Sequence, residues 1–274
     1  MTVAAYGKVN LTLEVYNRRG DGYHALRSVV LPVSLFDTLE VEDALGFSCD
    51  SGYPDDLCLK AARVLDPTRG AAIHVEKHIP AGGGLGGGSA DAAATLRALN
   101  ELWGLMKTRE ELAEIGAQVG SDVPALVLGG PVLMEGRGEC VRRIPLAAPL
   151  NLVLVNPGVA CSTAEVYAAC RPRPATDASA TDAMVAALAA GDFDAAVAAL
   201  GNDLQAPATA LCPAVARTLA DLRAAGAEGV SMSGSGSSVF ALVGSEAAAI
   251  ELAAKMQATG SAAWAVQSVG DFNL

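Results

Sequence analysis

A run of glycines early in the chain constrains the fold more than any other feature. Residues 80–91 of the 274 read PAGGGLGGGSAD, in which six residues are glycine and a leucine separates two glycine triplets. Glycine loses more backbone freedom on folding than any other residue, so the rest of the fold must hold this segment in place. The residues that follow, AAATLRAL, are typical of a helix. A glycine loop that opens a helix directs several backbone N–H groups at one point, at the positive end of the helix dipole. The segment therefore predicts a phosphate site rather than a flexible linker.

Generic phosphate motifs leave the ligand of this loop open. The pattern G-x-G-x-x-G occurs at Gly82, Gly84 and Gly87. A dinucleotide-binding fold also needs an acidic residue about 20 residues later, at the end of the next strand. The segment that follows here has two helical patterns instead. A P-loop needs a Lys and a Ser or Thr after its last glycine, and a protein kinase needs its V-A-I-K, H-R-D and D-F-G motifs. The chain has none of these.

Composition and charge exclude several classes of protein. A net charge of −11 argues against a general nucleic-acid or anionic-membrane binder, which needs a basic surface. No apolar run approaches the roughly 18 residues of a membrane span, and the first residues lack the pattern of a signal peptide. Six cysteines without a C-x-x-C pair indicate reduced thiols in a cytoplasmic protein. His74 and His78 lie in a strand-to-turn segment and would not share a face, so no zinc-type site is expected.

The periodicity of the chain predicts an α+β protein with helices on one face of a sheet. A second structural unit is expected to begin near Pro149. Strands are predicted over residues 9–15, 28–41 with a break at Pro32, 73–76, 152–155, 230–232, 239–243 and 262–266, with a hairpin over 131–145. Helices are predicted over residues 57–65, 92–103, 108–120, 184–200, 213–225 and 246–257. Capping boxes at Thr108 and Ser162 mark two helix starts.

Three separated segments together resemble the motifs of the GHMP small-molecule kinases. They are AYGKVN at residues 5–10, the glycine loop at 79–92 and SMSGSGSSVFA at 231–241. Their order and spacing fit over nearly the whole chain. The resemblance implies a two-domain α+β fold with the active site in the cleft between the domains. Residues 1–148 would form the ATP-binding domain and 149–274 a ferredoxin-like domain, and the enzyme would use ATP and Mg²⁺.

Three further details narrow the resemblance within that family. GGGLGGGS, DGYH at residues 21–24 and GSDVP at 120–124 are similar to members that act on a CDP-linked substrate. This implies phosphorylation of the 2-hydroxyl of a CDP-linked methylerythritol, on the methylerythritol phosphate route to isoprenoid precursors. The alternatives are another GHMP kinase, acting on homoserine, mevalonate or a sugar, and a catalytically silent nucleotide-binding relative. A dinucleotide oxidoreductase rests on the weak glycine pattern alone. We expect a monomer or weak homodimer.

The resemblance assigns the two catalytic roles to Asp122 and Lys8. An alcohol is a poor nucleophile at neutral pH, so a carboxylate that takes its proton and a cation near the γ-phosphate fit the reaction. Each residue has an alternative interpretation. A strand lysine such as Lys8 usually reaches solvent, and an aspartate before a helix such as Asp122 often caps it.

The resemblance also implies two sets of binding residues. Those for ATP are Lys77, Pro80, Gly82, Gly83, Gly84, Leu85, Gly86, Gly87, Gly88, Ser89, Ser235 and Gly236. Those for the substrate are Asn10, Tyr23, His24, Thr163 and Tyr167. In the ATP set, Ser89 is a candidate Mg²⁺ contact or a helix N-cap. Lys77 would lie near the nucleotide base or in solvent. In the substrate set, the aromatic rings could stack on cytosine while the imidazole pairs with its edge. Exposed turn residues and ordinary helix packing are the alternatives for Tyr23, His24 and Tyr167.

The chain departs from the family pattern at three places. Ala90 follows Ser89 where a second serine is common, so a hydroxyl contact is missing or supplied elsewhere. Asp55 and Asp56 stand where an asparagine near the adenine is frequent, which puts that contact in doubt. Residues 6–7 in the first motif are Tyr-Gly instead of the usual Pro and Ala types.

Overall fold

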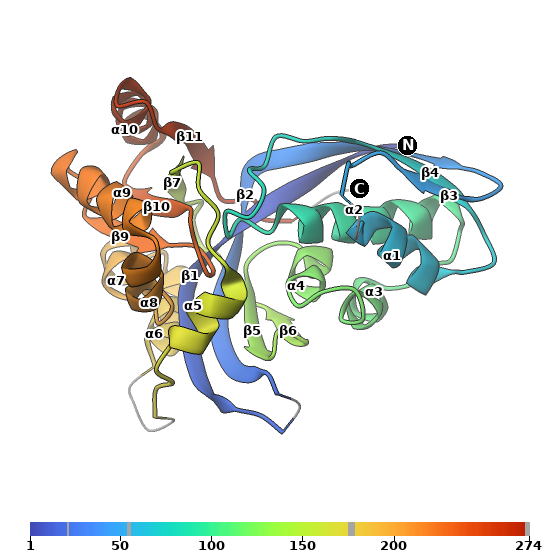
Figure 1. Cartoon of the computed structure of the whole chain (residues 1–274), viewed down its shortest axis with the longest axis horizontal. Helices are drawn as coiled ribbons and strands as arrows, with labels where there is room; N and C mark the ends of the chain where they lie inside the picture. Colours follow the sequence, from blue (N-terminus) through green and yellow to red (C-terminus); the bar gives the residue numbers. More distant parts are fainter. Residues whose placement is uncertain (21, 54–55, 175–178, 272–274) are drawn as a thin grey trace.

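Two long antiparallel strands form the centre of the molecule. The computed structural model describes residues 1–20, 22–53, 56–174 and 179–271. Strand β1 (Thr2–Arg18) pairs with β2 (His24–Asp43) along most of their length. In Figure 1 this pair crosses the molecule, with helices α1–α4 to its right and the second sheet with its helices to its left. The predicted α+β class is confirmed.

The larger sheet is built around this pair. Its strand order is β3-β4-β2-β1-β8, and β5 joins β2 and β6 beside this path. The added strands are β3 (Phe47–Cys49), β4 (Ala71–Glu76), β5 (Val132–Gly136), β6 (Cys140–Arg143) and β8 (Gly201–Asn202). Strands β5 and β6 are the predicted hairpin. Because β8 comes from the second half of the chain, this sheet continues past residue 148.

The polar residues in the middle of β1 do not face solvent. The alternation over residues 9–15 is typical of a strand with one solvent-exposed face. Every residue from Val9 to Val15 is nevertheless buried. Side-chain and backbone polar groups of this stretch meet the second half of the chain. The Thr181 hydroxyl donates to Thr12 Oγ1 (3.0 Å), and Asn10 N donates to Ser233 Oγ (3.3 Å). The alternating pattern therefore marks an interface between the two halves, closed by hydrogen bonds.

The predicted break at Pro32 is wrong, because β2 runs through it. Pro32 lies opposite Lys8, where the register between β1 and β2 shifts after Tyr6. A proline has no N–H to donate, and strands tolerate it at such irregularities, where the ladder is already interrupted.

Four helices cover the larger sheet. They are α1 (Leu57–Leu65), α2 (Gly87–Leu102), α3 (Arg109–Gly116) and α4 (Val123–Leu128). The capping box of α3 is present: Glu111 N donates to the Thr108 hydroxyl oxygen and Thr108 N donates to Glu111 Oε2. Helix α2 starts five residues earlier than the predicted residue 92, so the second glycine triplet and Ser89 belong to its N-terminal region. This places the glycine loop directly at the N-terminus of α2.

The second sheet has four antiparallel strands in the order β11-β7-β10-β9. They are β7 (Asn151–Asn156), β9 (Gly229–Met232), β10 (Val239–Val243) and β11 (Ala262–Gln267). The helices of this half are α5 (Thr163–Ala169), α6 (Ala180–Ala190), α7 (Phe193–Ala198), α8 (Gln205–Leu211), α9 (Pro213–Ala224) and α10 (Glu246–Ala258). In sequence the strands follow the β-α-β-β-α-β order of ferredoxin-like folds.

The single helix predicted over residues 184–200 is wrong. Two helices, α6 and α7, occupy this stretch, because Gly191 adopts a left-handed conformation (φ +69°) that ends α6. Asp192 then caps α7 by accepting a hydrogen bond from Ala195 N. Helix α8 was not predicted, and its first residue has no capping side chain among the described contacts.

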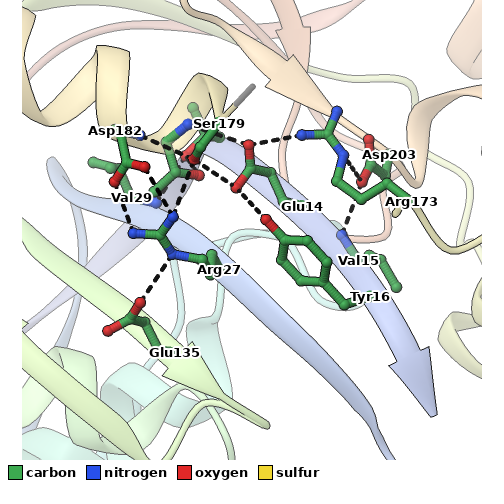
Figure 2. A network of polar contacts seen from close by, with 12 residues as sticks. Glu14, Val15, Tyr16, Arg27, Val29, Glu135, Arg173, Ser179, Asp182 and Asp203 are labelled. Carbon is green, nitrogen blue, oxygen red and sulfur yellow. Dashed lines mark hydrogen bonds and ion pairs between the residues drawn. The ribbon is translucent and has the colours of Figure 1, made fainter. Parts of the chain in front are cut away.

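Figure 2 shows the polar network that ties the lower end of β1 and β2 to the second half. Glu14 is buried, and it accepts hydrogen bonds from Arg173 Nη1 (2.7 Å) and the Ser179 hydroxyl (3.0 Å). Arg27 on β2 pairs with Asp182 in the first turn of α6 (2.8 Å). A buried carboxylate is tolerable because it is paired in this way.

Within the described parts of the chain, every helix is too short or too polar to cross a bilayer.

Candidate active site

A cleft of about 1340 Å³ lies where the two halves meet, and it collects nearly all of the predicted site residues. The predicted residues that line it are Lys8, Asn10, Tyr23, His24, Lys77, Pro80, Gly82, Gly83, Gly84, Gly86, Gly87, Gly88, Ser89, Asp122, Thr163, Tyr167, Ser235 and Gly236. Leu85 is the exception among them. Its side chain is 1% exposed and packs in the core, so it anchors the middle of the loop.

The glycine loop needs its glycines for two physical reasons. Gly82, Gly84 and Gly86 have φ values of +66°, +76° and +71°, in the left-handed region that side chains disfavour. A Cβ on Gly84 would also lie 2.2 Å from the carbonyl oxygen of Ser233. Gly86 is the N-cap of α2 and cannot cap the helix with a side chain. The first-turn N–H groups of α2 therefore have no side-chain cap, and Gly87, Gly88 and Ser89 line the cleft, where the predicted anion site would lie.

The second glycine-rich segment, residues 233–238, donates hydrogen bonds to the glycine loop and holds it in place. Ser238 N donates to the carbonyl oxygen of Gly83 (3.0 Å), and the Ser233 hydroxyl donates to that of Gly84 (2.8 Å). Ser235 and Gly236 face the cleft from this segment. The Ser235 and Thr163 hydroxyls are 2.8 Å apart, which links the segment to the start of α5.

Lys8 and Asp122 form an ion pair at the base of the cleft. Lys8 Nζ lies 3.2 Å from Asp122 Oδ2, and the Lys8 side chain is 3% exposed. The interpretation of Lys8 as a lysine that reaches solvent is therefore wrong. Asp122 precedes α4, but its carboxylate accepts no capping hydrogen bond from the described backbone of that helix. Its oxygens are left for Lys8 and for a ligand in the cleft.

Asn10 holds Lys8 in place. Lys8 Nζ donates to Asn10 Oδ1 (2.7 Å), and Asn10 Nδ2 donates to the Ser28 hydroxyl oxygen (2.8 Å). Asn10 is buried, so the interpretation of it as a strand-surface amide is wrong. The chain of hydrogen bonds fixes the ammonium group opposite the carboxylate of Asp122.

Lys77 belongs to a buried triad at the start of the loop. Its ammonium group lies 2.5 Å from Asp37 Oδ2 and 2.6 Å from Asp91 Oδ2. Burial raises the pKa of the Asp91 carboxyl to about 7, although Lys77 counteracts this. Lys77 lines the cleft but is not the solvated lysine of the alternative interpretation. One cation between two carboxylates fixes the end of the β4 segment against α2.

Two aromatic residues that line the cleft, His24 and Tyr167, lie close to each other. The rings of His24 and Tyr167 have centroids 6.0 Å apart and are inclined by 31°. His24 Nδ1 lies 2.9 Å from the backbone oxygen of Tyr16. A carbonyl oxygen can only accept, so Nδ1 carries a proton, and in the neutral ring Nε2 is then the acceptor. Burial raises the pKa of the Tyr167 hydroxyl, and nearby Asp122 raises it further, so that group stays protonated.

Tyr23 is exposed, at 54%. The guanidinium of Arg137 lies over its ring, 5.4 Å from the centroid. Arg137 also lines the cleft. Asp21, the first residue of the DGYH segment, lies outside the described residues.

The departures from the family pattern have structural counterparts. Ala90 is 2% exposed and packs in the core, so the side chain at this position does not line the cleft. Ser89, in the first turn of α2, lines the cleft. Asp56 lines the cleft and caps α1, accepting a hydrogen bond from Leu59 N (2.8 Å). Asp55 lies outside the described residues.

Comparison with known proteins agrees with this geometry. Residues 56–130 match the GHMP kinases N terminal domain, and residues 184–262 match the GHMP kinases C terminal model. The chain belongs to the GHMP kinase family. Its predicted resemblance to this family, and to the members with a CDP-linked substrate, is confirmed by the relatives described next.

Two curated relatives of this GHMP kinase are named 4-diphosphocytidyl-2-C-methyl-D-erythritol kinase. The protein of Brevibacillus brevis is 42% identical over 260 residues, which cover 90% of this chain and 89% of the relative. That of Exiguobacterium sibiricum is 43% identical over 252 residues and 88% of each chain. A crystal structure of 4-(cytidine 5'-diphospho)-2C-methyl-D-erythritol kinase has a TM-score of 0.85 and 36% identity, and the match covers 98% of this chain and all of that one. A homoserine kinase from Cytophaga hutchinsonii shares the fold at 21% identity, with a TM-score of 0.78, over 99% of this chain and 95% of its own.

Several cleft residues of this GHMP kinase carry no local sequence signal. Arg137 lies in a hairpin turn that was predicted only as a turn. Asp37 is buried behind the cleft, where it holds the cleft residue Lys77, and it sits in the middle of a long strand. Ser51, Tyr53 and Cys58 line the cleft near α1. These residues reach the cleft because of how their segments pack in the tertiary structure, and the spacing of residues in the sequence does not encode that packing.

Substitution of two glycines should separate loop strain from helix propensity. Gly84→Ala should destabilise the fold by about 3 kcal/mol or more, because a left-handed alanine is strained and its Cβ would meet Ser233. Gly88→Ala is the matched control. It lies in α2, its Cβ would meet nothing closer than Leu57 Cδ1 at 3.6 Å, and alanine favours a helix by about 0.5–1 kcal/mol. Urea unfolding of both variants measures the difference, and equal stabilities would contradict this account of the loop.

Proposed function

We propose that this GHMP kinase transfers the γ-phosphoryl group of ATP to the 2-hydroxyl of 4-diphosphocytidyl-2-C-methyl-D-erythritol, on the methylerythritol phosphate route. The observation that carries the proposal is the Lys8–Asp122 ion pair, 3.2 Å long, in the cleft that also holds the glycine loop and the His24–Tyr167 pair. The relatives of that name support the choice of substrate. A catalytically silent relative would have no need for this ion pair.

The ATP phosphates would bind at the N-terminus of α2. Backbone N–H groups of residues 82–89 and of Ser235 and Gly236 would surround them, and the missing Cβ atoms allow close approach. Lys77 would steady the start of the loop and lie near the nucleotide base. The helix dipole adds to the attraction for phosphate without a further side chain.

Mg²⁺ prefers oxygen ligands, and the donor set in the cleft fits it. The Ser89 hydroxyl faces the cleft from the first turn of α2, so Ser89 and the phosphates of ATP would hold the ion. When bound, the ion would neutralise charge that develops on the transferred phosphoryl group.

The protein's own part in the reaction is positioning, proton transfer and charge stabilisation. Asp122 would accept the proton of the substrate's 2-hydroxyl. The hydroxyl oxygen would attack the γ-phosphorus as the bond between that phosphorus and the ADP oxygen breaks. The Lys8 ammonium, fixed by Asn10, would face the negative charge that develops. Lys8 is buried, so its charge acts in a medium where electrostatic forces are stronger than in water.

The cytosine would lie between the aromatic side chains at the far end of the cleft. Tyr23 and Tyr167 would stack on its faces, and His24 Nε2 would accept a hydrogen bond from its exocyclic amine. Thr163, hydrogen-bonded to Ser235, would contact the substrate between the two ends. Homoserine and mevalonate carry no base, so they would leave this end unused.

Three expectations from the sequence remain predictions. They are the domain boundary between residues 148 and 149, the cytoplasmic location, and a monomer or weak homodimer. Small-angle scattering and limited proteolysis would test the assembly and the boundary.

A substrate panel tests the proposed function. The purified chain with Mg·ATP should release ADP with the CDP-linked methylerythritol and give only background release with homoserine or mevalonate. A coupled assay for ADP and phosphorus NMR of the product would measure this. Turnover of homoserine or mevalonate, with none of the CDP-linked compound, would overturn the substrate assignment.

Replacement of Asp122 tests the proton acceptor. Asp122→Asn keeps the size of the side chain but removes its basicity, so kcat should fall by roughly 10²–10⁴-fold with little change in substrate Kd. Calorimetry would report binding and the ADP assay would report turnover. Glu251→Gln, the same acid-to-amide change in an exposed pair on α10, is the control and should leave kcat unchanged. Wild-type turnover by the Asp122 variant would refute the role.

Replacement of His24 tests the recognition of the base. His24→Ala should raise KM for the CDP-linked substrate by roughly tenfold or more, because one hydrogen bond and one ring contact are lost. KM for ATP should stay the same, since ATP binds at the other end of the cleft. His74→Ala, at an exposed histidine paired with Asp50, is the control. An equal rise in both KM values would point to a general structural defect instead.

A further inference from the structure

Two thiols and a carboxylate meet beside the start of α2, although the sequence does not suggest it. Cys49 ends β3, Asp56 caps α1, and Cys58 lies in the first turn of α1. Their donor atoms, two Sγ and one carboxylate oxygen, all lie within 4.8 Å of one another. The spacing C-x₈-C matches no familiar zinc pattern, which is why the sequence predicted no such site.

The separation of the donors suits a metal ion. A tetrahedral Zn²⁺ ion with Zn–S bonds of about 2.3 Å places two sulfur ligands about 3.8 Å apart. The sulfurs of Cys49 and Cys58 lie within 4.8 Å of each other. Movements on the order of 1 Å would therefore bring all three donors into a first coordination shell.

The surrounding structure orients these donors. The backbone of Cys49 is paired with Ile73 of β4, and Cys58 is buried in α1. Asp56 is held by the Ser51 hydroxyl on one oxygen and by Leu59 N on the other. A carboxylate offers about four lone-pair positions, so both oxygens keep capacity for a further partner. Ligands fixed by outer hydrogen bonds in this way are typical of metal sites.

We propose that Cys49, Asp56 and Cys58 form a three-ligand site for a thiophilic divalent cation of the Zn²⁺ class, with water as the fourth ligand. Thiolates select such ions over Mg²⁺, which prefers oxygen. On binding, each thiol gives its proton to solvent, so three negative ligands hold one dication. Cys49 is half-buried, which leaves a path for the ion, and Asp56 and Cys58 open toward the cleft, which supplies the water.

The site adjoins the place where ATP would bind. Ser51, Asp56, Leu57 and Cys58 line the same cleft as the glycine loop. A Cβ on Gly88 would lie 3.6 Å from Leu57 Cδ1, so this wall touches the start of α2. A bound ion would draw Asp56 and Cys58 together and reshape this wall. We therefore expect Zn²⁺ to raise KM for ATP, a consequence that rests on the proposed function.

Metal binding to the full chain tests the site without any use of activity. Reduced protein is titrated with Co²⁺ under anaerobic conditions, and Zn²⁺ affinity is measured by competition with a chromogenic chelator. One equivalent of Co²⁺ should bind with sulfur-to-cobalt charge-transfer absorption. Cys49→Ser and Cys58→Ser should abolish that absorption and weaken Zn²⁺ binding beyond the roughly 10–100-fold of an outer-shell change. Cys140→Ser, at an exposed thiol outside the cleft, is the matched control and should bind as the wild type does.

Three results would overturn the proposal. One is the absence of charge-transfer absorption in the wild type, and another is unchanged Zn²⁺ affinity in Cys49→Ser, a half-buried position that tolerates serine. The third is intact-mass evidence that Cys49 and Cys58 form a disulfide and retain no metal, which would make them a redox pair. If the kinase assay fails while the Co²⁺ spectrum appears as expected, the proposed function is at fault and the metal site stands.

Discussion

The two glycine-rich segments hold each other in place, and the active-site cleft depends on that contact. The carbonyl groups of Gly83 and Gly84 accept hydrogen bonds from Ser238 N and the Ser233 hydroxyl. The contact is so close that a Cβ on Gly84 has no room. Many backbone conformations are open to a glycine loop, so without these bonds its N–H groups would not converge. The loop from the first half is therefore ordered by the second half.

The same dependence runs along β1. Polar groups in its middle face the other half of the chain, where Asn10 N donates to Ser233 and Arg173 donates to Glu14. Buried polar groups are costly when unpaired, so this face is stable only when the two halves are docked. Lys8, on the same strand, obtains its fixed position from Asn10. A Cβ on Gly234 of the second half would lie 3.4 Å from Lys8 Nζ, so docking of the halves encloses the Lys8–Asp122 pair.

Buried charges in this protein serve position more than stability. The Lys77 ammonium lies between Asp37 and Asp91, and the Lys8 ammonium lies beside Asp122. Removal of one member of such a group leaves a charge unpaired in the interior, which costs about 3–5 kcal/mol in typical cases. Apolar residues could fill the same space with equal stability, but they could not fix the Asp122 carboxylate at the cleft or hold the start of the glycine loop against α2.

The sequence by itself determined the parts of this protein that depend on local chemistry. The glycine loop, the Thr108 capping box and most strands follow from residues close together in the chain, because backbone freedom, capping and side-chain alternation are local properties. It failed at Pro32 and at Gly191, where an irregular register and a left-handed turn decided the outcome. Only the tertiary structure decided that Lys8 is buried against Asp122 and that Arg137 lies over the ring of Tyr23. It also decided that the donor atoms of Cys49, Asp56 and Cys58 lie within 4.8 Å of one another. These pairings join distant or irregularly spaced residues, and their geometry is set by how the sheets and helices pack, which no short-range pattern encodes.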